Sequence, residues 1–235
     1  MKSGDSAVRR AVLKHCFESS GGARARVPSL ELLELLVEHL PNESAPPLQR
    51  KCLKRLAEIL QSVVREFDAP QQRHLPAEVV DSNFARLRVA VSEVMSFVCA
   101  FISSAVRHSA SPSTSAAQPS TLAAAAQSSP TLSEKSIQAA VGAAAAAASA
   151  ATTACSPAAD VEFIFQNLFH VVTGSIVLSD HPDVAEACAA AVASSGVMRH
   201  DVWAAKFSSC LLGLIQVCGS LQLREHSNNC CSPRS

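Results

Sequence analysis

Residues 109–157 read SASPSTSAAQPSTLAAAAQSSPTLSEKSIQAAVGAAAAAASAATTACSP, and the rest of the chain is organised around this segment. It carries one acidic residue, Glu134, one basic residue, Lys135, and no aromatic residue. A segment of this composition buries too little apolar area to offset the entropy lost when its backbone becomes ordered. We therefore predict a largely disordered, low-complexity linker at 109–157 between two helical blocks.

The second half of the linker has a stronger tendency to form a helix. Residues 132–151 are mostly alanine, with interruptions at Gly142 and Ser149, and alanine has the highest intrinsic helix propensity. We predict a fraying, solvated helix there. The linker would act as a tether that can be modified at Ser-Pro pairs, or it is an expanded insertion with no role of its own.

Length and charge narrow the class of protein. The 235 residues allow one or two domains, and the 20 Lys and Arg residues balance the 20 Asp and Glu residues. This balance argues against a global field that attracts nucleic acid or an anionic membrane. The charge is nevertheless uneven, because residues 1–75 hold 12 basic and 9 acidic side chains, whereas residues 158–235 hold 4 and 7.

The nine cysteines lack the paired spacing of a zinc site or of a secreted disulfide framework. We interpret them as small apolar residues in a reducing compartment, which indicates a cytoplasmic or nuclear protein. Acylation of the adjacent Cys230 and Cys231 is an alternative for that pair. A mitochondrial presequence is a weaker alternative for the basic amino terminus, because Asp5 and Glu18 interrupt its pattern.

Apolar residues recur at helical spacing on both sides of the linker. We predict an amino-terminal block at 1–108 with helices at 6–19, 30–40, 48–67 and 79–105, a carboxy-terminal block at 158–223 with helices at 160–178, 184–193 and 201–223, and a flexible tail at 224–235. The absence of Tyr and of period-two runs argues against strands, so the predicted fold class is all-α. Polar interruptions such as Glu93 and Glu162 argue against membrane spans.

Two helix pairs share one plan. Residues 30–40 are joined by a proline-containing turn to 48–67, and residues 161–178 are joined by Asp180-His-Pro-Asp183 to 184–193. The second helices begin Leu48-Gln-Arg-Lys-Cys-Leu and Val184-Ala-Glu-Ala-Cys-Ala. This plan resembles the HEAT and armadillo class of helical repeats over about half the chain, although Gln49 and Ala185 stand where HEAT second helices often carry Arg. The resemblance implies antiparallel helix pairs stacked as a short irregular α-solenoid, and protein binding rather than catalysis.

No motif for phosphate binding, nucleophilic hydrolysis or metal binding is present in the sequence. The candidates for a nucleophile or ligand are His15 beside Cys16, His170, and His181 near Asp183 and Cys188. Each has a simpler interpretation, because His170 lies within an apolar helix and His181 lies in a turn that solvent can reach. We expect no catalytic residue, no cofactor and no metal.

Four cations, Arg50, Lys51, Lys54 and Arg55, occupy the first two turns of the predicted helix at 48–67. The helix dipole disfavours a cation there by roughly 0.3–1 kcal/mol, and less in salt. Compensation by Glu58, Glu34 and Glu38 would make them an ordinary solvated face. The alternative is that these four residues bind a protein partner with an acidic surface.

These observations favour a non-enzymatic interaction scaffold or adaptor of the helical-repeat type, as found in larger transport or assembly factors. The alternative is a helical nucleic-acid-associated module that acts through the basic amino-terminal block. Binding that weakens with salt at one slope for all nucleic acid sequences would favour the second interpretation.

Overall fold

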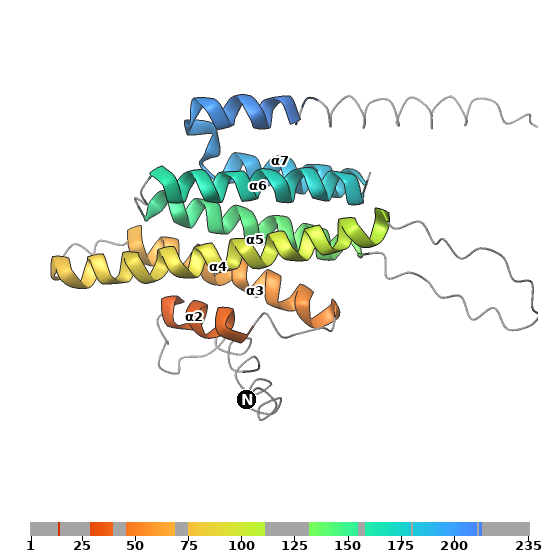
Figure 1. Cartoon of the computed structure of the whole chain (residues 1–235). Helices are drawn as coiled ribbons and strands as arrows, with labels where there is room; N and C mark the ends of the chain where they lie inside the picture. Colours follow the sequence, from red (N-terminus) through yellow and green to blue (C-terminus); the bar gives the residue numbers. More distant parts are fainter. Residues whose placement is uncertain are drawn as a thin grey trace, which may run out of the picture.

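The computed structural model describes residues 29–39, 46–68, 75–110, 132–154, 158–179 and 181–210, together with Lys14 and Leu212. The helices are α2 (Ser29–His39), α3 (Pro46–Asp68), α4 (Ala77–Ala110), α5 (Glu134–Thr153), α6 (Ala158–Leu178), α7 (Pro182–Ser194), the short 3-10 helix η3 (Val197–Arg199) and a helical segment at 201–210 (Figure 1). The described residues form no strand, which confirms the all-α fold class.

The helices predicted at 30–40, 48–67, 79–105, 160–178 and 184–193 are present with boundaries close to those expected. α4 begins early because the Pro76 carbonyl accepts the N–H groups of Val79 and Val80. The predicted helix at 6–19 lies outside the described residues apart from Lys14. Residues 111–131, 213–223 and the tail at 224–235 also lie outside them, so the proposed boundaries of the linker and blocks remain predictions.

α5 departs from the expectation of a solvated helix. All six consecutive residues from Ala143 to Ala148 are buried, and six residues exceed one helical turn, so every face of α5 is covered. α5 contacts α3, α4, α6 and α7. The expectation was wrong because it counted only the apolar area that the alanines themselves supply.

Small side chains also affect the distance between neighbouring helices. Alanine holds little volume between two helix axes, so neighbouring helices can approach closely. The Leu, Val and Phe side chains of the neighbours then bury their own apolar surface against α5. A helix that is apolar on all sides belongs in a core, and α5 meets that condition.

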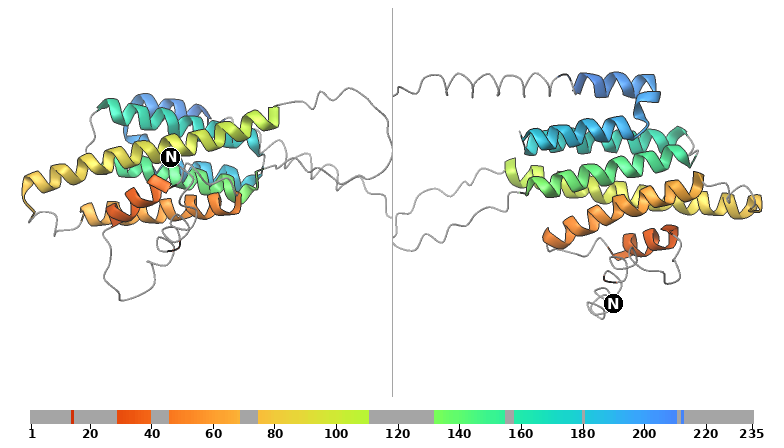
Figure 2. Two further views of the ribbon diagram at one scale, coloured as in Figure 1. Left: turned by 60° about the horizontal axis from the view of Figure 1, so that its bottom comes forward. Right: turned by 180° about the vertical axis from the view of Figure 1, so that it is seen from behind.

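The helices form two layers, and α5 belongs to one of them. In one layer α4 contacts both α2 and α6, and in the other α5 contacts both α3 and α7. The layer of α4 and α6 faces the viewer in Figure 1, and the layer of α3, α5 and α7 faces the viewer in the right view of Figure 2. α3 and α4 follow one another in sequence but have only marginal contact, because α5 lies against both.

Contacts between α4 and α6 show that these two helices run in the same direction. The Cys99 thiol lies 3.2 Å from the Asn167 Oδ1, and the Ser103 hydroxyl lies 2.8 Å from the His170 Nε2. Further along, Gly174 lies against Ile102: a Cβ added at Gly174 would be 2.6 Å from the Ile102 Cγ2. The two helices therefore approach most closely where α6 has no side chain.

α5 and α7 also run in the same direction. At their starts, Glu134 faces His181 at 3.8 Å, and after their ends Gly196 lies beside Thr152. Gly196 has φ of 76°, in the left-handed region that only glycine adopts freely, and it ends α7 so that the chain can turn into η3.

Aromatic side chains attach the helical segment 201–210 to α6. The Trp203 ring lies 6.4 Å from Phe169, the Phe207 ring lies 5.2 Å from Phe169, and the indole N–H of Trp203 donates to the Glu162 carboxylate at 2.9 Å. Edge-to-face geometry and a satisfied indole N–H favour this packing. The segment therefore extends the layer that contains α6.

Two helices are long and apolar enough, by length and composition alone, to cross a membrane: α4 over residues 77–107, and α6. Both helices contribute buried side chains to the core around α5, including Val94 and Met95 of α4 and Phe165 and Leu168 of α6. Within the protein, 33% of the apolar window of α4 and 39% of that of α6 is buried. The absence of a membrane span remains a prediction.

The first prediction tests the burial of α5. Ala144 is fully buried, so Ala144→Leu should overpack the core and lower the free energy of unfolding by about 1–3 kcal/mol. The matched control is Ala190→Leu on the exposed face of α7, which should change that free energy by less than about 0.5 kcal/mol. Urea unfolding of both variants measures the difference, and equal effects would show that α5 is not the packed helix described above.

The second prediction contrasts two helical glycines. A Cβ at Gly142 meets nothing within 4 Å, so Gly142→Ala should stabilise α5 by about 0.5–1 kcal/mol. Gly174→Ala should destabilise the protein by about 1–3 kcal/mol, because the β-branched Ile102 cannot easily move its Cγ2 away. Thermal melts monitored by circular dichroism would show opposite shifts in Tm. Shifts of the same sign would contradict the close approach of α4 and α6.

Candidate protein-binding surface

The four predicted partner-binding residues lie at the start of α3, but they do not form one uniform surface. Lys51 and Lys54 are exposed and Arg50 is half-buried, whereas the Arg55 side chain is only 12% exposed. Arg55 Nη1 donates to the Glu58 carboxylate at 2.8 Å. Arg55 therefore belongs to an internal ion pair of α3, and Arg50, Lys51 and Lys54 are the residues that a partner could reach. We call these three residues the basic surface.

Of the three acidic side chains expected to compensate the cations of α3, Glu34 is paired with another helix instead. Glu34 binds Arg86 of α4 in two places, Nε to Oε1 at 2.8 Å and Nη2 to Oε2 at 2.5 Å. This contact raises the pKa of the Arg86 guanidinium, chiefly through the hydrogen bond to Glu34. Of the three expected acids, Glu58 alone is seen paired with a cation of α3.

The local electrostatics leave the basic surface without an ion pair among the described residues. No ion pair joins Arg50, Lys51 or Lys54 to a carboxylate in that part of the chain, and the first turn of α3 contains no acidic residue. Because α3 starts at Pro46, Arg50 and Lys51 lie in its second turn and Lys54 in its third, where the helix dipole has little effect on them.

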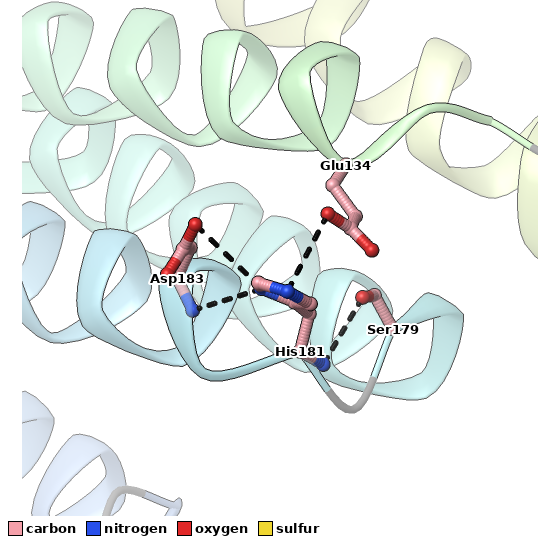
Figure 3. Close-up of polar contacts among 4 residues, drawn as sticks. All are labelled: Glu134, Ser179, His181 and Asp183. Carbon is pink, nitrogen blue, oxygen red and sulfur yellow. Dashed lines mark hydrogen bonds and ion pairs between the residues drawn. The ribbon is translucent and has the colours of Figure 1, made fainter.

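A second polar cluster surrounds His181, at the junction of α6, α7 and α5 (Figure 3). The Asp183 N–H donates to the His181 Nδ1 at 3.3 Å, and the His181 N–H donates to the Ser179 hydroxyl at 3.2 Å. Because Nδ1 accepts, the proton of the neutral ring sits on Nε2, which faces Glu134 at 3.8 Å. His181 thus acts as the N-cap of α7 and ties it to the start of α5.

Sequence reasoning missed the pairing of His170 with Ser103, because these residues lie on different helices. The distance of 2.8 Å between the Ser103 Oγ and the His170 Nε2 suits a nucleophile and its base. Acyl transfer also needs an oxyanion hole and a group that orients the histidine. Ser103 lies inside α4, where backbone N–H groups are used within the helix, and no carboxylate of the described residues is bonded to His170. The pair therefore fits a contact between helices.

The described cysteines have the character of core residues. Burial raises the pKa of the Cys99 thiol to about 11, and burial, with a smaller contribution from Cys210, raises that of Cys188 to about 12. Both thiols are protonated at neutral pH, which suppresses nucleophilic and metal-binding reactivity. Within the described ranges no group of three or more His, Cys, Asp and Glu side chains could hold a metal ion. His15 and Cys16 lie outside those ranges.

No protein-family model, no curated protein and no solved structure matches the chain.

The third prediction concerns the His181 cap. His181→Ala removes the acceptor for the Asp183 N–H and should cost about 1 kcal/mol of unfolding free energy. His181→Asn restores an acceptor at the same position without the imidazole that faces Glu134, so it should recover most of that loss. Chemical unfolding would compare the two variants. Equal losses would show that the Glu134 contact matters more than the cap.

Proposed function

We propose that this protein is a non-enzymatic interaction scaffold, a short irregular α-solenoid that binds other proteins. The observation that carries the proposal is the arrangement of contacts around α5. Helices two apart in sequence pack side by side in each layer, as α3 and α5 do, while α3 and α4 have only marginal contact. In a simple up-and-down bundle, helices adjacent in sequence would share the largest contacts.

Further contacts support a stack of helix pairs. Ser29, at the start of α2, is hydrogen-bonded through its N–H and its hydroxyl to the carboxylate of Glu66, near the end of α3, as expected for an antiparallel pair. α4 with α5 and α6 with α7 would be the second and third pairs, and parallel helices within each layer follow from stacking them. The predicted linker at 109–157 contains α5, so only the part of it that precedes α5 joins the two helices of the middle pair.

The basic surface is the part of this scaffold that we propose binds a partner. Its exposed lysines have no ion pair among the described residues, and the first turn of α3 contains no acidic residue. A protein with an acidic surface would bind there with electrostatic steering. A nucleic acid is the competing ligand. Its binding would weaken with salt at one slope for all sequences, which distinguishes it from a protein partner.

The fourth prediction tests the basic surface with Arg50→Gln, Lys51→Gln and Lys54→Gln in one variant. Partners would be captured from a lysate, identified by mass spectrometry, and measured individually against both proteins. We expect the captured partner to be an acidic protein. At low salt its on-rate should be roughly tenfold slower for the variant than for the wild-type protein, and the on-rate for the variant should no longer depend on salt. The free energy of unfolding should stay equal or rise slightly.

The matched control changes three exposed cations on other helices, Arg107→Gln, Arg199→Gln and Lys206→Gln, which removes the same charge. It should retain the on-rate of the wild-type protein. Equal loss in both variants would show a general charge effect and refute the basic surface. Nuclease-sensitive capture with one salt slope for all sequences would instead assign the protein to nucleic acid binding.

A further inference from the structure

The helical segment at 201–210 packs on α6 with one face and exposes the other. Its buried rings, Trp203 and Phe207, contact α6, and Figure 1 shows the segment at the end of the stack of helices. Val202 and Leu212 lie outside this contact, with 66% and 60% of their surface exposed. Two large apolar side chains are therefore left in solvent on the last described helix.

The exposed face has a spacing that suits a second helix. Val202, Ala205, Ser209 and Leu212 are all exposed and follow one another by three, four and three residues. This is the spacing of the a and d positions of a two-stranded coiled coil, so the four side chains lie in one line along the helix. We call these four residues the seam.

The middle of the seam can be covered at little cost. Ala205 and Ser209 are small, which allows two helix backbones to approach closely there. The Ser209 hydroxyl donates to the Ala205 carbonyl at 3.1 Å, so its proton keeps an acceptor when water is removed. The larger side chains of Val202 and Leu212 at the two ends of the seam supply apolar area to bury.

Two opposite charges flank the seam on its two sides. Asp201 and Lys206 are exposed, and no ion pair joins either of them to another described residue. The Lys206 Nζ lies 4.0 Å from the centroid of the Trp203 ring, which holds the ammonium group beside the seam and leaves its charge in place. With Val202 at position a, Asp201 occupies position g and Lys206 position e. In parallel helix pairs, positions g and e of the two helices face each other.

We infer that a second copy of this chain binds along the seam, with the two helices parallel and related by a two-fold axis that runs between them. Each seam residue then meets its own counterpart. Each Asp201 faces the Lys206 of the other copy, so the symmetry forms two ion pairs at once. The remaining described residue at a flanking position, Ser208, is uncharged, so no like charges meet across the seam.

The charges argue against an antiparallel copy. Centring such a copy on the seam would place Val202 opposite Leu212 of the other copy, which is acceptable for packing. It would also bring the two Lys206 side chains together on one side, because an antiparallel pair joins position e to position e. Asp201 would then have no cation of the seam opposite it. The parallel arrangement is therefore the one that both the apolar spacing and the charges favour.

The inference goes beyond the proposed function, since it concerns a different helix and does not use the basic surface. The seam is about 15 Å long, at 1.5 Å per residue. Such a contact is smaller than the roughly 1,000 Å² of a stable interface. The dimer should therefore be weak, and it should weaken further as salt screens the two ion pairs.

The fifth prediction uses charge reversal beside the seam. Asp201→Lys brings cations together on both sides of the dimer, and Lys206→Asp brings anions together. In sedimentation velocity of the full chain at about 50 mM salt, each variant should dimerise at least roughly tenfold more weakly than the wild-type protein. An equal mixture of the two variants should form a heterodimer, and a variant with both changes should form a homodimer again.

The apolar part of the seam is tested separately. Val202→Ser with Leu212→Ser removes both ends of the seam and should abolish the dimer at every salt concentration. The matched control is Val89→Ser with Val177→Ser, which changes two equally exposed valines on α4 and α6 and should leave dimerisation unchanged.

A control for the charges is Asp160→Lys, which reverses another exposed aspartate in the first turn of a helix, α6. It should dimerise as the wild-type protein does, and equal weakening by Asp160→Lys and Asp201→Lys would reduce the result to a general charge effect and refute the inference. A stronger dimer for Lys206→Asp would overturn the parallel arrangement. Circular dichroism checks that every variant is folded.

A wild-type chain that stays monomeric at low salt and high concentration would overturn the inference, as would a mixture that does not associate. If that monomer also loses Tm when Val202 and Leu212 are changed to serine, the seam is covered by other residues of the same chain. The Gln variant of the basic surface retains the whole seam and should dimerise normally, so the dimer and the proposed function can fail independently.

Discussion

The structure depends on the small volume of the alanine side chains of α5. Four helices contact α5, and its six consecutive buried alanines allow each neighbour to approach without a gap. The larger apolar side chains come from the surrounding helices, such as Leu56 of α3, Met95 of α4 and Phe165 of α6. α3 and α4 thus meet mainly through α5. Larger residues in α5 would separate these layers and leave the apolar faces of their neighbours open to water.

Polar contacts near the surface fix how neighbouring helices are aligned, whereas the core holds the helices together. Arg86 with Glu34, Glu66 with Ser29, and His181 with Glu134 each join two helices near the surface. Exposed ion pairs contribute little free energy individually. Each contact does, however, favour one relative position of two helices. The close approach at Gly174 also restricts this alignment, because a side chain there would clash with Ile102 of α4.

α3 contributes to the core on one face, and its opposite face is the one that we propose binds a partner. Its buried face supplies Leu53, Leu56 and Leu60 to the core, whereas its exposed face carries Lys51 and Lys54, which have no ion pair among the described residues. A partner with the opposite charge would supply one, which connects the local electrostatics of this helix to the proposed scaffold function.

The sequence by itself determined the all-α class, the ranges of five helices and the cations at the start of α3, because apolar periodicity and helix ends are local properties. The tertiary structure decided which helices meet. Alanine fits both a solvated helix and a buried one, so the location of α5 depended on the large side chains of its neighbours. Gly142 and Gly174 look alike in the sequence, but only Gly174 faces another helix. Likewise, Glu34 binds Arg86 rather than the cations of α3, and Ser103 meets His170, because residues distant in the chain become neighbours only after the layers pack.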